Sequence, residues 1–272
     1  LGGASLGALE EIGELAPLHN VPAVEAARRA MALLPGVPHV AVFDTAFHAG
    51  LPEEAATYAL PRRWREDWGI RRVGFHGLSV AWSAERAAAL LRRDPADLRL
   101  VVCHLGGGCS ATAVLGGRSV DTTMGFSPQE GLVMATRCGS VDPAIAFHLI
   151  GRHGMEPRAV EDALTRGSGL LGLAGSADMR EVERAAATGD PDAARALAVH
   201  DHRLAAAVAG MVPALGGLDA LVFTGGVGEG SARTRAEAGR RLAPLGVGIP
   251  ADGGTGEGDR EITAPGARVR TL

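Results

Sequence analysis

Residues 98–122, LRLVVCHLGGGCSATAVLGGRSVDT, decide the fold. Short apolar runs bounded by glycines are typical of buried strands. The stretch therefore predicts three consecutive strands, at Leu98–Leu105, Ser110–Leu115 and Arg118–Thr122. Gly106-Gly107-Gly108 forms the first turn, and Gly116-Gly117 forms a two-residue hairpin turn of the primed type. We therefore expect an antiparallel meander here.

A second group of elements surrounds this meander. Leu221–Thr224 is an apolar strand that leads into Gly225-Gly-Val-Gly228 and then into a helix from about Glu229 to Leu242. Apolar spacing predicts the other helices at 6–34 with breaks at Pro17 and Pro22, at 53–68, at 79–93, and through most of 143–217, the longest being 192–215. Short strands are expected at 39–43, 261–263 and 268–272. The order of these elements predicts an α/β fold with a mixed sheet.

Composition excludes several classes of protein. The 272 residues are 46% hydrophobic and 21% charged, with a net charge of −4, and no apolar run approaches a membrane span. Nothing here favours binding to nucleic acid or to a membrane. The three cysteines give neither a disulfide framework nor a metal-ligand spacing, so we expect an intracellular, cytoplasmic protein. All 27 basic residues are arginine, so a catalytic cation must be arginine or histidine.

Three loops carry candidate phosphate-binding groups. Phe223–Gly230 places glycines between a strand and a helix, where backbone amides favour an anion, although close packing is an alternative. His104–Ser110 has more glycines than a turn needs, which indicates a nest of amides or else a bulged hairpin. Arg137, in the loop Met134–Pro143, is either a clamp for phosphoryl charge or a surface arginine that caps a helix.

Three further polar residues lie at strand ends or turns. Asp44 follows the apolar run 39–43, and ligands gather at the carboxyl ends of strands, where aspartate can hold a metal-bound phosphate. His19 and His76 lie in turns, and on the residues alone a structural role for each histidine is the more common one.

Taken together, these runs resemble one family. In chain order they are Leu15-Ala-Pro-Leu-His-Asn20, Val42-Phe-Asp-Thr-Ala-Phe-His48, Gly74-Phe-His-Gly77, His104-Leu-Gly-Gly-Gly108, Met124-Gly-Phe-Ser-Pro128, Thr136-Arg-Cys-Gly139 and Phe223-Thr-Gly-Gly-Val-Gly-Glu229. Over essentially its whole length the chain is similar to the acetokinase family, and the run Val42–His48 resembles one of that family's signatures. The resemblance implies an actin-like or hexokinase-like ATPase fold, with a ribonuclease H-like mixed sheet and flanking helices.

The resemblance also implies an activity, namely reversible transfer of the ATP γ-phosphoryl group to acetate, with Mg²⁺, to give acetyl phosphate and ADP. Family members are typically homodimers. The catalytic residues it implies are Asp44, His76 and Arg137, and the substrate-binding residues are Leu18, His19, Phe75 and Pro128. The nucleotide-binding or phosphate-binding residues it implies are His104, Gly106, Gly107, Gly108, Asp178, Met179, Arg180, Gly226, Val227, Gly228 and Gly230.

Physical chemistry agrees with these roles. Phosphoryl transfer depends on positioning and on charge compensation, which arginine and histidine can supply. The acceptor carboxylate is already an anion and needs no general base. An apolar wall of Leu18, Phe75 and Pro128 separates acids that differ by one methylene by only about 1–3 kcal/mol, so acetate, propionate and butyrate all remain candidate substrates.

The ends and several internal positions depart from the family pattern. The chain starts at Leu1 and stops in the β-like run 268–272, so we expect both ends to be cut. We therefore expect residues 1–45 to be the remnant of a first domain and 46–272 to be a nucleotide-binding domain without its last segment. The family's metal-binding glutamate is expected beyond Leu272, so no metal ligand is assigned within the chain. The internal departures are Ala23, Val80, Gly107, Ser140 and Gly230, where the family usually has asparagine, histidine or aspartate.

These departures keep a second hypothesis open. Each lost hydrogen bond to a charged or buried group costs about 1–3 kcal/mol. A truncated relative that binds nucleotide without catalysing transfer is therefore the alternative to an active acetate, propionate or butyrate kinase.

Overall fold

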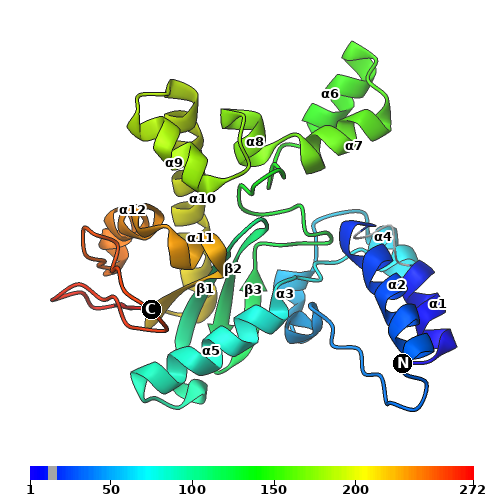
Figure 1. The fold of residues 1–272 in the computed structure, drawn as a ribbon, viewed down its shortest axis with the longest axis horizontal. Coiled ribbons are helices and arrows are strands. Elements are labelled where there is room, and N and C mark those ends of the chain that lie inside the picture. Colours follow the sequence, from blue (N-terminus) through cyan, green and yellow to red (C-terminus); the bar gives the residue numbers. More distant parts are fainter. Residues whose placement is uncertain (12–16) are drawn as a thin grey trace.

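The core of the protein is a five-stranded mixed sheet. The computed structural model describes residues 1–11 and 17–272. Strand order is β3-β2-β1-β4-β5 (Figure 1). The meander consists of β1 (Arg99–Leu105), β2 (Cys109–Leu115) and β3 (Arg118–Thr122), which pair antiparallel. β4 (Ala220–Thr224) lies parallel to β1, and β5 (Arg270–Thr271) lies parallel to β4. The predicted α/β class with a mixed sheet is therefore confirmed.

The hairpin between β2 and β3 shows why this sequence turns where it does. Gly116 and Gly117 have φ values of 56° and 74°. Both values are positive, as a primed turn requires, and glycine adopts them without steric cost. Thr112 and Thr122 face each other across the pair, with their hydroxyl oxygens 2.9 Å apart.

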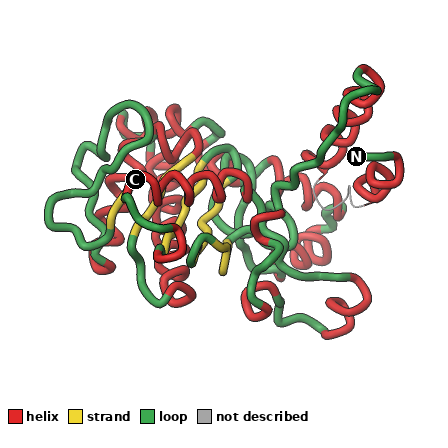
Figure 2. The backbone as a smooth tube through the Cα atoms, turned by 90° about the horizontal axis from the view of Figure 1, so that it is seen from below, coloured by secondary structure: helices red, strands yellow, loops and turns green. Residues whose placement is uncertain are grey.

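Helices cover both faces of the sheet, and this explains why β1 is apolar almost throughout. α10 (Pro191–Leu215) and α12 (Ala232–Leu242) pack against one face, where Val101, Cys103 and Leu105 point. α5 (Gly77–Leu91) packs against the other face, with Leu100 and Val102. Figure 2 shows the strands between these helices. A strand buried on both faces cannot alternate polar and apolar residues.

A smaller helical layer extends the α10 side. α8 (Gly169–Ala174) and α9 (Met179–Ala187) pack on the first half of α10. α6 (Ala144–His153) and α7 (Pro157–Arg166) project away from the sheet (Figure 1).

The N-terminal segment lies beside the sheet rather than in it (Figure 1). It contains α1 (Gly3–Glu11), α2 (Pro17–Leu33), α3 (Glu53–Ala56) and α4 (Arg62–Trp68). Pro17 begins α2, where its missing N–H costs nothing, but Pro22 lies inside the helix, so the predicted break there is wrong. The single helix predicted over 53–68 is two helices, and Pro61 precedes the second one.

Three other predictions of local structure need correction. The run 39–43 is a loop that pairs with no strand of the described chain, and Val40 and Val42 are 81% and 67% exposed. Residues 261–263 are likewise not a strand, although the Ile262 N–H donates to the Thr271 carbonyl at 2.7 Å. The helix predicted from Glu229 is two helices, α11 (Gly225–Gly230) and α12, because Ser231 caps the second by accepting from the Thr234 N–H at 3.0 Å. None of the helices in residues 1–11 and 17–272 has the length and apolar character of a bilayer-spanning segment.

Shortening a buried side chain of the central sheet should lower the stability of the protein. Leu221 on β4 is fully buried, so Leu221→Ala removes packed atoms and leaves a cavity. We expect it to lower the free energy of unfolding by about 2–5 kcal/mol. Leu115→Ala, at a position that is 41% exposed, is the matched control and should cost less than about 1 kcal/mol. Urea denaturation of both variants measures the difference, and equal losses would contradict the assigned packing.

Candidate active site

A sharp turn before α5 brings Asp44 and His76 together. The His76 backbone N–H donates to Asp44 Oδ2 at 2.8 Å, and the Gly77 N–H donates to the Asp44 carbonyl at 2.7 Å. A Cβ on Gly77 would lie 2.4 Å from that carbonyl oxygen, so only glycine fits. His76 itself has φ 61°, which is uncommon for a residue with a side chain. Such backbone strain is often found at functional sites.

The His76 ring lies among polar partners from the meander. Its Nδ1 is 3.0 Å from Ser110 Oγ, and its ring centre is 4.2 Å from that of His104. His104 Nδ1 is in turn 2.8 Å from Ser79 Oγ on α5. The sheet and the turn before α5 therefore fix both imidazoles.

Arg137 and Gly108 complete the cluster. A Cβ built on Gly108 would lie 3.1 Å from His76 Nε2 and 3.3 Å from the second terminal nitrogen of Arg137. The first terminal nitrogen of Arg137 donates to the Pro128 carbonyl at 2.6 Å. In the described part of the chain, no carboxylate forms an ion pair with this half-buried guanidinium. Arg137 therefore has a positive charge available to an anionic ligand beside the glycine turn.

The histidines here are neutral rather than cationic near pH 7. Burial lowers the pKa of His76 to about 4, with the neighbouring His104 and Arg137 adding to the effect and Asp44 opposing it. Burial also lowers the pKa of His104 and of His48. A neutral imidazole can still donate a hydrogen bond, so Arg137 is the cation of this cluster.

The glycine turn between β1 and β2 retains free backbone donors. The Gly106 N–H donates to the Gly108 carbonyl at 2.9 Å. Within residues 1–11 and 17–272, no acceptor pairs with the amides of Gly107 and Gly108. Successive free amides in a turn form a concave anion site.

His48 contacts the loop at Phe75, an interaction that the sequence did not indicate. His48 Nε2 is 2.9 Å from the Phe75 carbonyl, and Nδ1 is 2.8 Å from Ser119 Oγ. A Cβ on Gly74 would overlap the His48 ring. His48 thus supports Phe75 and His76, a role that the sequence analysis did not assign.

The loop that carries Pro128 is held by a second network that sequence reasoning missed. Arg72 donates to the carbonyls of Thr122, Thr123 and Met124 at 3.0–3.1 Å and to Glu130 at 2.9 Å. Tyr58 donates to the same glutamate, and burial is the main reason that the pKa of Tyr58 rises to about 12. Leu18 and His19 lie in α2, but their side chains are outside the described part of the structure.

A cavity of about 570 Å³ lies beside the glycine turn. It brings together residues that are far apart in the sequence. The predicted site residues that line it are Gly106, Gly107, Asp178, Met179, Arg180, Gly226, Val227 and Gly230. Asp178 caps α9 by accepting from the Arg180 N–H at 2.9 Å. Residues not predicted also line it, among them Cys109, Glu183, His200 and Ser231.

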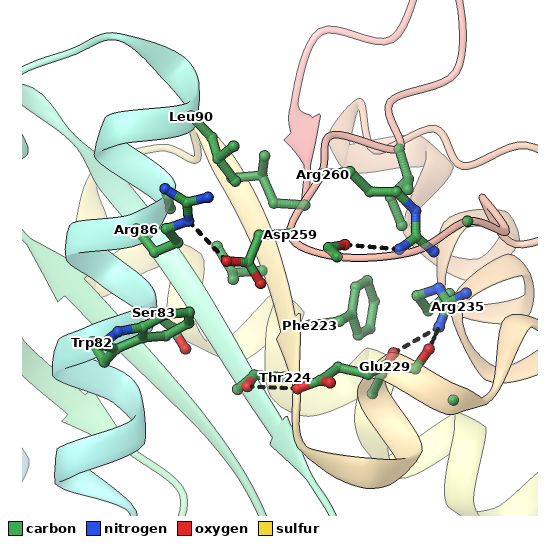
Figure 3. A pocket seen from close by; sticks show the side chains of 18 of the residues that line it. Trp82, Ser83, Arg86, Leu90, Phe223, Thr224, Glu229, Arg235, Asp259 and Arg260 are labelled. Atoms are coloured by element: carbon green, nitrogen blue, oxygen red, sulfur yellow. Dashed lines mark hydrogen bonds and ion pairs between the residues drawn. The ribbon is translucent and has the colours of Figure 1, made fainter.

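A second cavity, of about 450 Å³, lies between α5, β4 and residues 256–262 (Figure 3). Gly228 lines this second cavity instead of the first one, which departs from its grouping with Gly226 and Val227. Arg86 pairs there with Asp259 at 2.8 Å, and Arg235 donates to the Glu229 carbonyl at 2.7 Å. These charged groups already have partners, and Gly106 and Gly107 do not line this cavity. The second cavity is therefore the weaker candidate for nucleotide.

The chain is similar to known proteins over nearly its whole length. The sequence profile of the acetokinase family matches residues 4–271. The chain belongs to the acetokinase family. It is 47% identical over 267 residues to the acetate kinase of Cyanothece sp. (strain PCC 7425 / ATCC 29141), which covers 97% of this chain and 65% of that protein. It is 50% identical over 244 residues to the acetate kinase of Clavibacter sepedonicus, which covers 90% of this chain and 62% of that protein.

Solved structures of a propionate kinase and of an acetate kinase match the whole chain. A propionate kinase from Francisella tularensis subsp. tularensis SCHU S4 superimposes with a TM-score of 0.94 at 38% identity and is covered over 70% of its length. Porphyromonas gingivalis acetate kinase superimposes with a TM-score of 0.92 at 35% identity and is covered over 69%. The predicted actin-like ATPase fold is thereby confirmed. The chain spans somewhat less than two thirds of the length of the two acetate kinases compared by sequence.

Because the pKa of His76 is lowered in the folded protein, acidification should reduce the stability of the protein. Between about pH 6.5 and pH 4 the unfolded chain binds a proton at His76 that the folded chain does not bind, so stability falls as the pH falls. His76→Asn removes this pH dependence of stability, and asparagine tolerates the positive φ. Between pH 7 and pH 5 the free energy of unfolding of the variant should fall by about 1–2 kcal/mol less than that of the parent. Urea denaturation at the two pH values measures this, with His202→Asn on α10 as the exposed control. An equal loss of stability in His76→Asn and the parent would contradict a half-buried, neutral His76.

Proposed function

We propose that the chain carries the site of a carboxylate kinase, which transfers the γ-phosphoryl group of ATP to acetate and forms acetyl phosphate and ADP reversibly. The observation that carries this proposal is the convergence of His76, Gly108 and Arg137 within 3.3 Å of one point, with Asp44 bonded to the His76 backbone. Membership of the acetokinase family supports it.

The chemistry needs charge compensation at the phosphoryl group in flight. Arg137 supplies a cation, and neutral His76 donates a hydrogen bond to an equatorial oxygen. The amides of Gly107 and Gly108 bind phosphate oxygens from the other side. The carboxylate acceptor attacks as an anion, which explains why the low pKa of His76 is no obstacle: no general base is required.

The cavity of about 570 Å³ receives the rest of the nucleotide. Asp178, Met179 and Arg180 form one wall beside the adenosine, and Gly226, Val227 and Gly230 form the other. Gly228 supports the turn from the side of the second cavity. His104 positions His76 through the contact of their tilted rings and bonds α5 through Ser79.

Asp44 offers a carboxylate oxygen that suits Mg²⁺. Asp44 uses Oδ2 for the His76 N–H, which leaves Oδ1 available as an oxygen ligand. Mg²⁺ commonly binds one or two carboxylates together with substrate phosphates and water. Among the described residues, no group of three or more His, Cys, Asp or Glu side chains could hold a metal alone. When bound, Mg²⁺ would neutralise phosphate charge, and Asp44 is the residue that would hold it.

Propionate is the second candidate acceptor, because the propionate kinase structure superimposes on the whole chain. Phe75 and Pro128, with Leu18 and His19 from α2, form the proposed acyl end. One methylene changes selection by only about 1–3 kcal/mol, so relative rates with acetate, propionate and butyrate decide the acceptor.

The remaining assignments also belong to this proposal. We place the domain boundary between residues 45 and 46, with 46–272 forming the nucleotide-binding unit, and we expect a cytoplasmic homodimer. Binding of MgADP without acyl phosphate formation from any of the three acids would instead identify a nucleotide-binding relative without activity.

Substitution of Arg137 tests the proposed charge compensation. With acetate and MgATP, Arg137→Ala should lower kcat about 100-fold or more while changing KM for ATP much less, because the charge develops in the transition state. Trapping acyl phosphate with hydroxylamine measures the rate. Arg118→Ala, on the exposed end of β3, is the matched control and should behave as the parent. An unchanged kcat in Arg137→Ala would show that another group supplies the charge.

The glycine turn gives a second, steric test. Gly108→Ala places a methyl group 3.1 Å from His76 Nε2 and 3.3 Å from Arg137, so both side chains must shift. A shift of this kind costs about 10- to 100-fold in kcat. Gly107→Ala meets no atom within 4 Å and should lose less activity than Gly108→Ala. The reverse order would mean that the turn binds phosphate in another arrangement.

A further inference from the structure

Tyr58, Arg72 and Glu130 form a polar cluster at the base of the loop that carries Pro128. Arg72 donates to Glu130 Oε1 at 2.9 Å, and Tyr58 donates to Oε2 of the same carboxylate. The side chains of Arg72 and Glu130 are only 16% and 33% exposed. The Arg72 guanidinium also lies over the Tyr58 ring, 5.3 Å from its centre. Each member of the cluster therefore contacts the other two.

The cluster holds the loop through its backbone. The Phe126 N–H donates to the Tyr58 hydroxyl oxygen at 2.8 Å. A Cβ built on Gly125 would lie 1.7 Å from Glu130 Oε2 and 2.0 Å from the Tyr58 hydroxyl. The carboxylate and the hydroxyl therefore stand directly against the backbone at Gly125, and together they fix the path of residues 125–130.

The placement of Arg137 depends on this loop at two points. The first terminal nitrogen of Arg137 donates to the Pro128 carbonyl at 2.6 Å. Gly131, which follows Glu130 in the chain, closes the segment that carries Arg137. Its carbonyl accepts from the Ser140 N–H at 2.9 Å, and its own N–H donates to Ser140 Oγ at 3.0 Å. A shift of the loop would therefore displace the guanidinium.

The same loop is bonded to the turn before α5. The Gly125 carbonyl accepts from the N–H groups of Val73 and Gly74, at 3.0 and 3.2 Å. Arg72 directly precedes Val73 in the chain, so its backbone and its side chain both take part in this junction. One cluster therefore connects the two loops that carry the side chains proposed to bind the phosphoryl group.

We propose that Tyr58, Arg72 and Glu130 are positioning residues, which hold the Arg137 guanidinium in place through the Pro128 carbonyl and the junction at Gly131. The inference rests on the proposed function, in which Arg137 compensates phosphoryl charge. Phosphoryl transfer depends on the placement of charge, and a displacement of about 1 Å costs about 100-fold in rate. None of the three residues lines the cavity of about 570 Å³. Loss of the cluster should therefore lower kcat and leave nucleotide binding nearly intact.

Tyr58→Phe tests this role by the loss of one oxygen atom. It removes the donor to Glu130 and the acceptor of the Phe126 N–H, and it keeps the ring beside Arg72. With acetate and MgATP, kcat should fall about 10-fold and KM for ATP should change less than about 2-fold. Glu130→Gln removes the charge that pairs with Arg72 and should act in the same direction. Glu53→Gln, at a side chain of α3 that is 86% exposed, is the matched control and should behave as the parent.

A double-mutant cycle separates positioning of Arg137 from a general loss of stability. In an Arg137→Ala background there is no guanidinium to hold, so Tyr58→Phe should lower kcat less than about 2-fold further. A loss of about 10-fold in both backgrounds would overturn the proposal, because the cluster would then act independently of Arg137. Circular dichroism checks that each variant folds, and if Tyr58→Phe does not, Glu130→Gln takes its place in the cycle.

Chemical modification reports the restraint on Arg137 without turnover. Phenylglyoxal reacts with guanidinium groups, and peptide mass spectrometry follows the rate at each arginine. Tyr58→Phe and Glu130→Gln should each raise the rate at Arg137 about 10-fold, because the loop that holds it opens more often. Glu53→Gln should leave the rate unchanged. Arg235, which is 4% exposed, is the internal reference. An unchanged rate at Arg137, or an equal rise at Arg235, would overturn the proposal.

The two measurements distinguish this proposal from the proposed function. If the parent chain forms no acyl phosphate and both variants still speed the modification of Arg137, the proposed function fails and the restraint on Arg137 is supported. If the parent forms acyl phosphate and both variants keep its kcat, the proposed function is supported and the positioning role is overturned.

Discussion

The parallel pairing of β1 with β4 is the contact on which the rest of the structure depends. Residues 100–104 pair with 220–224, so both strands end at the same edge of the sheet, with His104 opposite Thr224. The glycine turn after β1 and the glycine-rich helix α11 after β4 therefore lie side by side. A Cβ on Gly225 would be 2.7 Å from the Leu105 carbonyl, which shows how closely the two loops approach. In α/β sheets ligands bind outside such carboxyl ends.

Electrostatics then divides this edge into two regions. Around His76, burial keeps the imidazoles neutral and leaves Arg137 as a cation, which suits a mobile phosphoryl group. Around His200, burial acts in the same direction, but the interaction with Asp201, 3.2 Å from Nδ1, helps to outweigh it and the pKa of His200 rises to about 9. The glycine turn Gly106–Gly108 connects the two regions. This turn thus lies between the half-buried Arg137 guanidinium and the buried His200–Asp201 pair.

Much of the fold could be predicted from the sequence, because its signals are local. The meander, its primed turn and the strand that leads into α11 follow from apolar runs and glycines. The run 39–43 fits a strand by composition, but a strand needs a partner, and the described chain offers none. The 3.6-residue spacing predicts one helix at 53–68. Two helices form instead, and Pro61 directly precedes the second one.

The site residues could be predicted from the sequence only where they belong to family motifs. The grouping of His76, Gly108 and Arg137 depended on the resemblance, and the structure adds their contacts. His48 and Ser119 are 71 residues apart, and Tyr58 and Glu130 are 72 residues apart, so no local pattern could pair them. The same holds for Asp201 and Arg233, 32 residues apart on two helices.

We propose that nucleotide binds at the edge formed by the two glycine loops. Amide hydrogen exchange with and without MgADP tests it most directly, because it reports on every loop at once. We expect slowed exchange at Gly106–Cys109, at 178–180 and at Gly225–Ser231. Slowed exchange confined to residues 256–262 and α5, around the cavity of Figure 3, would contradict it.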